Sequence, residues 1–286
     1  MSGVWHPLMA MEDPHPELLN PILVSQVVFA PIQERGSSET SDANLNAVWE
    51  FLQTGPSSLA HLQPSEGKRD WLAEMKERIF GSLREGLAIT RYHLDRVGLI
   101  ENRIEAIAKE HEAALLPSRN MVLSISSRPL VAEYQAFEFA LRRSLEYLAG
   151  AVSAYFKTEG NRIRNLAATV GGREPASASA AVVARLENAN IESLIGVRSG
   201  PKSVRDRVAH HESVSPGVIN IGRKFDGSLW VRLHGEAEDL NPSFLEETET
   251  LSEVLGRRIG QVEDLALGLF EDLGLLPDPS KVDRAT

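Results

Sequence analysis

The ten residues SVRDRVAHHE, from Ser203 to Glu212, bring together side chains that could transfer a proton or bind an anion. They comprise two arginines, an aspartate and two adjacent histidines. If the stretch is helical, Asp206 and His210 lie four residues apart and share a face. Asp206 would then hydrogen-bond one ring nitrogen of His210, fix its tautomer and raise its basicity. The other ring nitrogen would be free to move a proton.

An arginine beside a titrating histidine suits a phosphodiester. The guanidinium of Arg205 would bind the phosphate bidentately, and His210 would exchange a proton with the attacking or the leaving oxygen. Arg205 lies off the face of His210 in a straight helix, so the two converge only at an irregular helix end or in a cleft closed by a second subunit. RNA needs no metal for this reaction, because its own 2′-hydroxyl can be the nucleophile. His211, which shares a face with Arg207, is a second candidate for the proton transfer.

The same residues also fit a structural role. Ser203 and Asp206 form S-x-x-D at a helix start, an arrangement that satisfies backbone donors and complements the helix dipole. Val204 and Val208 would then form the buried side of the helix. The bare spacing of an arginine followed by a histidine four to six residues later is expected roughly twice by chance in a chain of this composition. The pattern alone leaves both interpretations open.

Other chemistry lacks sequence support. The chain contains no Walker A loop, no G-x-G-x-x-G after a strand, no G-x-S-x-G elbow and no H-E-x-x-H. It has no cysteine, which excludes disulfides, thiolate zinc sites and cysteine nucleophiles. His210, His211 and Glu212 point in different directions, so we expect no metal and no cofactor. We interpret the scattered histidines as surface or core residues: His6, His15, His61, His93, His111 and His234.

The elements that position SVRDRVAHHE are predicted to be mainly helical, since strand-like runs are short and Ala, Leu and Glu are common. Residues 1–69 are predicted to be an irregular N-terminal extension with one short helix, which Ser41 caps. Residues 70–128 are predicted to hold a long amphipathic helix, begun by Asp70 and ending near Leu115, and a loop. Its glycines are the places where it could bend: Gly81, Gly86 and Gly98.

Residues 129–273 are predicted to form the main helical domain. Pro129 opens a helix to Phe156. Its Glu138, Arg142 and Glu146, at four-residue steps, are interpreted as surface charges. Its predicted apolar face consists of Leu130, Tyr134, Phe137, Leu141, Leu145, Leu148, Val152 and Tyr155. The stretch TVGGREPASASAA is predicted to be a mobile connection before a helix near 180–195.

A β-hairpin is predicted at about 218–234, and a final helix from Asn241-Pro242 to about Leu273. The core candidates of this helix are Leu245, Leu251, Leu255, Ile259, Val262, Leu265 and Leu269. Residues 274–286 form a tail. The expected fold is mainly α, an up-and-down helical bundle with one inserted hairpin and a long additional helix.

Charge is distributed unevenly along this acidic chain of formal net charge −10. Residues 157–207 hold nine basic and five acidic side chains, whereas residues 236–286 hold thirteen acidic and four basic ones. SVRDRVAHHE therefore ends the most basic segment. The net negative charge of the whole chain nevertheless argues against general binding to nucleic acid. No signal-peptide pattern and no membrane-spanning apolar run is evident, so we expect a cytoplasmic protein without membrane contact.

The sequence R-D-R-V-A-H-H resembles the signature of the HEPN superfamily (higher eukaryotes and prokaryotes nucleotide-binding domains). That signature is an arginine, then a polar residue, with a histidine four to six residues after the arginine; here these are Arg205, Asp206 and His210, with His211 also in range. The helix through AFEFALRRSLEYLAGAVSAYF and the acidic last helix also resemble such domains. The resemblance covers about residues 129–273 and leaves 1–128 without a counterpart.

This resemblance implies a helical bundle that dimerises so that two Arg/His motifs face one cleft. It implies a metal-independent endoribonuclease of toxin–antitoxin or phage-defence systems, acting on RNA and regulated by an antitoxin or another protein. Arg205 would bind the scissile phosphate, His210 would act as general acid or base, and Asp206 would orient the pair. The alternative is a catalytically inactive HEPN-like scaffold, or a nucleotide- or partner-binding module.

Overall fold

The computed structural model describes residues 39–55, 57–63, 68–116, 123–125, 127–195, 202–210, 214, 216, 218–223, 226–234 and 250–276. The chain divides into two units, Met1–Arg35 and Gly36–Thr286, and all of the described residues belong to the second unit. Several predictions concern parts of the chain outside these residues. They are the predictions for residues 1–38, the side chains of Ser41 and His234, His211, the Asn241-Pro242 helix start and the tail beyond 276.

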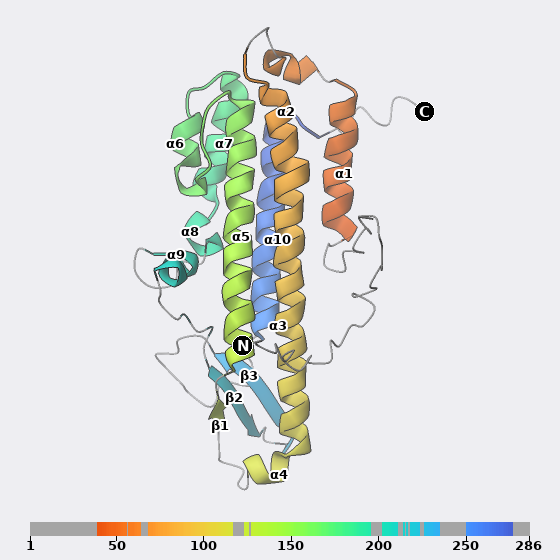
Figure 1. The fold of residues 1–286 in the computed structure, drawn as a ribbon, viewed down its shortest axis with the longest axis vertical. Coiled ribbons are helices and arrows are strands. Elements are labelled where there is room, and N and C mark those ends of the chain that lie inside the picture. The colour runs from red at the N-terminus through yellow and green to blue at the C-terminus, as the bar shows by residue number, and fades with distance from the viewer. Residues whose placement is uncertain are drawn as a thin grey trace, which may run out of the picture. The chain divides into compact units, whose positions relative to one another are not determined.

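Three long helices lie side by side and confirm the predicted bundle (Figure 1). They are α3 (Arg84–Glu110), α5 (Arg128–Tyr155) and α10 (Leu251–Asp272), and α3 runs antiparallel to the other two. The predicted long helix is real. It starts as α2 (Trp71–Lys76), capped by Asp70, passes through a π-helical segment, η3 (Glu77–Leu83), and continues as α3. Of the three glycines predicted to permit a bend, Gly81 lies in the π-helical segment.

The apolar periodicity predicted the core correctly. Every residue of the predicted apolar face of α5 is at most 3% exposed: Leu130, Tyr134, Phe137, Leu141, Leu145, Leu148, Val152 and Tyr155. Leu255, Ile259, Val262 and Leu269 of α10 are buried against them in the same cluster. Each of the long helices thus buries one stripe of residues, and its remaining faces are open to solvent or to shorter elements.

A small antiparallel sheet lies at one end of the bundle (Figure 1). The predicted hairpin is confirmed by β2 (Val218–Arg223) and β3 (Leu229–His234), in which Gly222 is opposite Trp230. The predicted loop before α5 is wrong in part, because β1 (Leu123–Ile125) pairs with β2, with Leu123 opposite Ile221. Three residues are too few for a visible alternation, and the pairing partner is distant in the sequence.

Shorter helices surround the bundle. They are α1 (Glu39–Gln53), η2 (Ser57–Leu62), α4 (Glu112–Leu115), η4 (Ile163–Asn165), α6 (Leu166–Val170), α7 (Ala176–Asn188), α8 (Ile191–Leu194) and α9 (Val204–Ala209). The prediction that TVGGREPASASAA is a mobile connection is wrong in its second half. Helix α7 begins at Ala176, since its alanines have the highest helix propensity.

A capping box marks the start of α10 at Leu251. Thr250 and Glu253 form a capping box: the Thr250 hydroxyl accepts from the Glu253 amide at 3.2 Å, and the Glu253 carboxylate accepts from the Thr250 amide at 2.7 Å. The carboxylate of Glu101 in α3 accepts from the amide of Leu251 at 2.8 Å. These contacts fix the start of α10 at Leu251.

Helices α3 and α5 approach each other closely at Gly86. A Cβ atom at this position would lie 2.6 Å from the Ser144 hydroxyl and 3.4 Å from the Ser144 Cα. Ser144 is buried, and its hydroxyl donates to the Ala140 carbonyl at 2.9 Å. The absence of a side chain at Gly86 therefore sets the separation of the two helices.

Replacing Gly86→Ala should lower the free energy of unfolding by about 1–3 kcal/mol, because the added methyl overpacks this contact. Adding Ser144→Ala should recover most of the loss. The control is Gly260→Ala in α10, where a Cβ meets nothing within 4 Å and should raise stability by up to about 1 kcal/mol. Urea denaturation measures all of these effects, and wild-type stability of the Gly86→Ala variant would contradict the packing account.

Candidate functional site

The predicted helix start at SVRDRVAHHE is present. Ser203 caps α9: its hydroxyl accepts from the Asp206 amide at 3.2 Å and donates to the Asp206 carboxylate at 2.8 Å. Val204 is buried, as the structural interpretation requires. Helix α9 is only six residues long and ends at Ala209, so that His210 is its C-cap residue.

Asp206 orients Arg205 instead of His210. Its second carboxylate oxygen accepts from the Arg205 Nη1 at 3.1 Å, and within the described residues it makes no hydrogen bond with the His210 ring. Burial alone would raise the pKa of Asp206, but the hydrogen bonds from Ser203 and Arg205 and the charge of Arg142 lower it below its ordinary value. The predicted Asp206–His210 hydrogen bond is therefore not found, because nearer donors occupy the carboxylate.

Of the other predicted site residues, Arg205 contacts this carboxylate and His210 does not. His210 is exposed at the end of α9, and Arg205 is partly buried. His211 lies outside the described residues. The structure thus joins Ser203, Arg205 and Asp206 into one cluster and leaves the His210 ring open to solvent.

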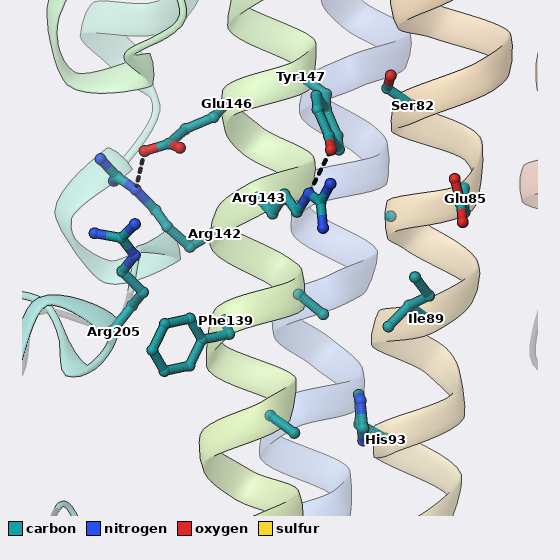
Figure 2. A pocket seen from close by; sticks show the side chains of 13 residues that line it. Ser82, Glu85, Ile89, His93, Phe139, Arg142, Arg143, Glu146, Tyr147 and Arg205 are labelled. Atoms are coloured by element: carbon teal, nitrogen blue, oxygen red, sulfur yellow. Dashed lines mark hydrogen bonds and ion pairs between the residues drawn. The ribbon is translucent and has the colours of Figure 1, made fainter. Parts of the chain in front are cut away.

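Arg205 lines a surface cavity of about 590 Å³ that extends over α5 between α3 and α9 (Figure 2). Helix α5 contributes the largest share of its wall. The π-helical segment η3 contributes Ser82, and α3 contributes Glu85, Gly86, Ile89 and His93. We call this cavity the α3–α5–α9 hollow. The full lining is Ser82, Glu85, Gly86, Ile89, His93, Ala136, Phe139, Ala140, Arg142, Arg143, Glu146, Tyr147 and Arg205.

Arginines dominate the charge of the hollow. Arg142 and Arg143 on α5 join Arg205 from α9, against the two glutamates Glu85 and Glu146. Arg142 is only 7% exposed. Its Nε donates to Glu146 at 3.0 Å, but its buried Nη1 has no hydrogen-bond partner among the described residues. An unsatisfied N–H of a charged group in such a place is costly, and Arg142 adds a positive charge to the wall of the hollow.

Two of the arginines are held against aromatic rings. The Arg205 guanidinium lies 5.8 Å from the centre of the Phe139 ring, and Arg143 donates to the Tyr147 hydroxyl beside its ring. Phe139 remains 37% exposed. These contacts hold the side chains of Arg205 and Arg143 at the hollow, where part of the Phe139 ring stays exposed.

The interpretation of Glu138 and Arg142 as surface charges is wrong. Glu138 is 1% exposed and binds Arg258 of α10 through both of its oxygens, at 2.5 and 2.7 Å. Arg258 also donates to the Leu194 carbonyl at the end of α8, at 3.1 Å. Burial alone would lower the pKa of Arg258, but the charge and hydrogen bonds of Glu138 raise it above its ordinary value. This ion pair links α5 and α10 to the segment that precedes α9.

His93 was not predicted to be a site residue. It lines the hollow from α3, and its Nδ1 lies 2.8 Å from the carboxylate of Glu133 on α5. The four-residue spacing of Glu85, Ile89 and His93 places them on one helix face, which was the available signal. The spacing could not show which helix faces that stripe.

The hollow can bind a phosphorylated or otherwise anionic ligand and offers an imidazole beside it. In the described part of the chain, no three His, Asp or Glu side chains are grouped as a metal site would require. None of the described helices is both long and apolar enough to cross a membrane. Comparisons with protein-family models, with curated proteins and with solved structures found no match to this chain.

Replacing Glu138→Gln should lower the free energy of unfolding by about 3–5 kcal/mol, because the charge of Arg258 would remain buried without its counterion. The matched control is Glu105→Gln, which breaks an exposed ion pair with Lys109 at 2.6 Å and should cost less than about 0.5 kcal/mol. Chemical denaturation compares the two variants. Equal small losses would show that the buried pair does not fix these helices.

Proposed function

We propose that this protein binds RNA in the α3–α5–α9 hollow and cleaves it without a metal ion, as an endoribonuclease of HEPN type. The observation that carries the proposal is the convergence of Arg142, Arg143 and Arg205, from two helices, on one cavity of an acidic chain. Phosphate is the anion that arginine binds best through paired N–H donors.

Binding of a phosphodiester explains two features of the hollow. A phosphate in the hollow would compensate the positive charge of Arg142, whose buried Nη1 has no hydrogen-bond partner among the described residues. An unpaired base would stack on the exposed ring of Phe139, a contact typically worth about 1–3 kcal/mol per base. Single-stranded RNA offers both groups at once.

Proton transfer in this proposal is assigned to the motif histidine. His210 follows α9 directly, so it is carried on the same short element as Arg205. Arg205 binds the scissile phosphate, Asp206 holds Arg205, and His210 exchanges a proton with a reacting oxygen. His211 is the alternative donor or acceptor.

The resemblance of R-D-R-V-A-H-H to the HEPN signature supports a homodimer in which two such motifs face one cleft. We further propose that the protein acts in the cytoplasm, as part of a toxin–antitoxin or phage-defence system. An antitoxin or another regulatory protein would be its partner. These finer assignments depend on the resemblance and not on the hollow.

One observation favours a second candidate function, a module that binds RNA or nucleotides without cleaving them. The carboxylate of Asp206 is engaged by Ser203 and Arg205, so it does not orient the His210 ring. The arginines alone suffice for phosphate binding.

Cleavage of a single-stranded RNA in EDTA tests both candidates. The wild type should cleave it, and Arg205→Ala and His210→Ala should each slow cleavage by at least about 100-fold, because they remove phosphate binding and proton transfer. His211→Ala measured in parallel decides between the two histidines.

The matched control is Arg207→Ala, which removes the same charge from α9 without touching the hollow and should retain the wild-type rate. Equal cleavage by the wild type and the Arg205→Ala variant would overturn the nuclease proposal. Intact RNA with binding that Arg205→Ala weakens would establish the second candidate instead.

A further inference from the structure

A histidine–carboxylate pair spans α3 and α5 at the edge of the hollow. The Nδ1 of His93 lies 2.8 Å from one oxygen of Glu133, and the other oxygen lies 3.6 Å from the Nε of Arg96. The His93 side chain is 21% exposed and the Glu133 side chain 20%. The pair is therefore largely enclosed by two long helices of the bundle.

The partner fixes the tautomer of the imidazole. An ionised carboxylate only accepts hydrogen bonds, so the Nδ1 of His93 must carry the proton that is shared with Glu133. The neutral ring then presents its Nε2 lone pair as a proton acceptor. This is the arrangement that a general base requires, with the base oriented by a second group.

The His93 ring lies at the α3–α5–α9 hollow. His93 and Arg205 line the same hollow, and Figure 2 shows the His93 side chain beside α5, below Ile89, on the α3 side of the arginines. Helix α3 belongs to the part of the chain that the HEPN resemblance does not cover. His210, in contrast, has no carboxylate partner among the described residues and does not line the hollow.

We propose that His93 is a catalytic residue of this site, the general base that activates the RNA 2′-hydroxyl. The inference rests on the proposed nuclease function. The Nε2 of His93 takes the proton of the 2′-hydroxyl as the 2′-oxygen bonds to phosphorus. The bond from phosphorus to the 5′-oxygen breaks, and that oxygen receives a proton from water. The products are a 2′,3′-cyclic phosphate and a 5′-hydroxyl.

The test compares His93→Gln with the wild type on single-stranded RNA in EDTA. Glutamine can still donate to Glu133 but cannot take up the proton, so kcat should fall by about 10²–10⁴-fold with KM changed less than about twofold. Affinity for uncleavable 2′-O-methyl RNA of the same sequence should be unchanged. In His93→Ala, added imidazole should restore part of the rate.

The matched control is His111→Gln, at the exposed C-cap of α3 and outside the hollow, which should keep the wild-type kcat. Thermal unfolding of each variant checks the fold, and the imidazole rescue separates lost chemistry from lost structure. A wild-type kcat for His93→Gln, with Arg205→Ala inactive, would overturn this inference alone. A loss confined to KM would do the same, whereas intact RNA with the wild type would overturn the proposed function and this inference together.

Discussion

The buried ion pair of Glu138 and Arg258 is the contact on which the rest of the structure depends. It joins α5 to α10, and the same guanidinium binds the Leu194 carbonyl at the end of α8. Desolvating two charges offsets much of their attraction, so the pair contributes more to the uniqueness of the arrangement than to net stability. Helix α9, which carries Arg205, packs against α5, the helix that carries Glu138.

Helix α5 serves the core and the hollow with different faces. Phe137 and Leu141 are buried among the long helices, whereas Phe139 and Arg143 face outward into the hollow. The close approach at Gly86 brings α3 near enough to form a second wall of the hollow. The cavity thus follows from helix packing, and rigid helices carry most of its lining, which is how a preorganised binding site is built.

The sequence predicted what local periodicity controls. Four predictions were correct because each depends on neighbours in the chain. They are the buried stripes of α5 and α10, the long helix that begins after Asp70, the hairpin and the Ser203 cap. Glu138 and Arg142 were misassigned because four-residue spacing does not reveal a partner on a distant helix. His93 was missed for the same reason, since Glu133 meets it across the bundle. The predicted Asp206–His210 hydrogen bond is not found, because Ser203 and Arg205 donate to the Asp206 carboxylate instead.

We propose that the arginines of the α3–α5–α9 hollow hold RNA phosphates. The salt dependence of binding to 2′-O-methyl RNA measures this directly, because each phosphate contact releases counterions and contributes about 0.7 to the slope of log K against log salt for a single strand. Arg205→Ala and Arg143→Ala should each reduce the slope by about 0.7, while Arg207→Ala should leave it unchanged. Slopes equal to that of the wild type for both hollow variants would contradict the account.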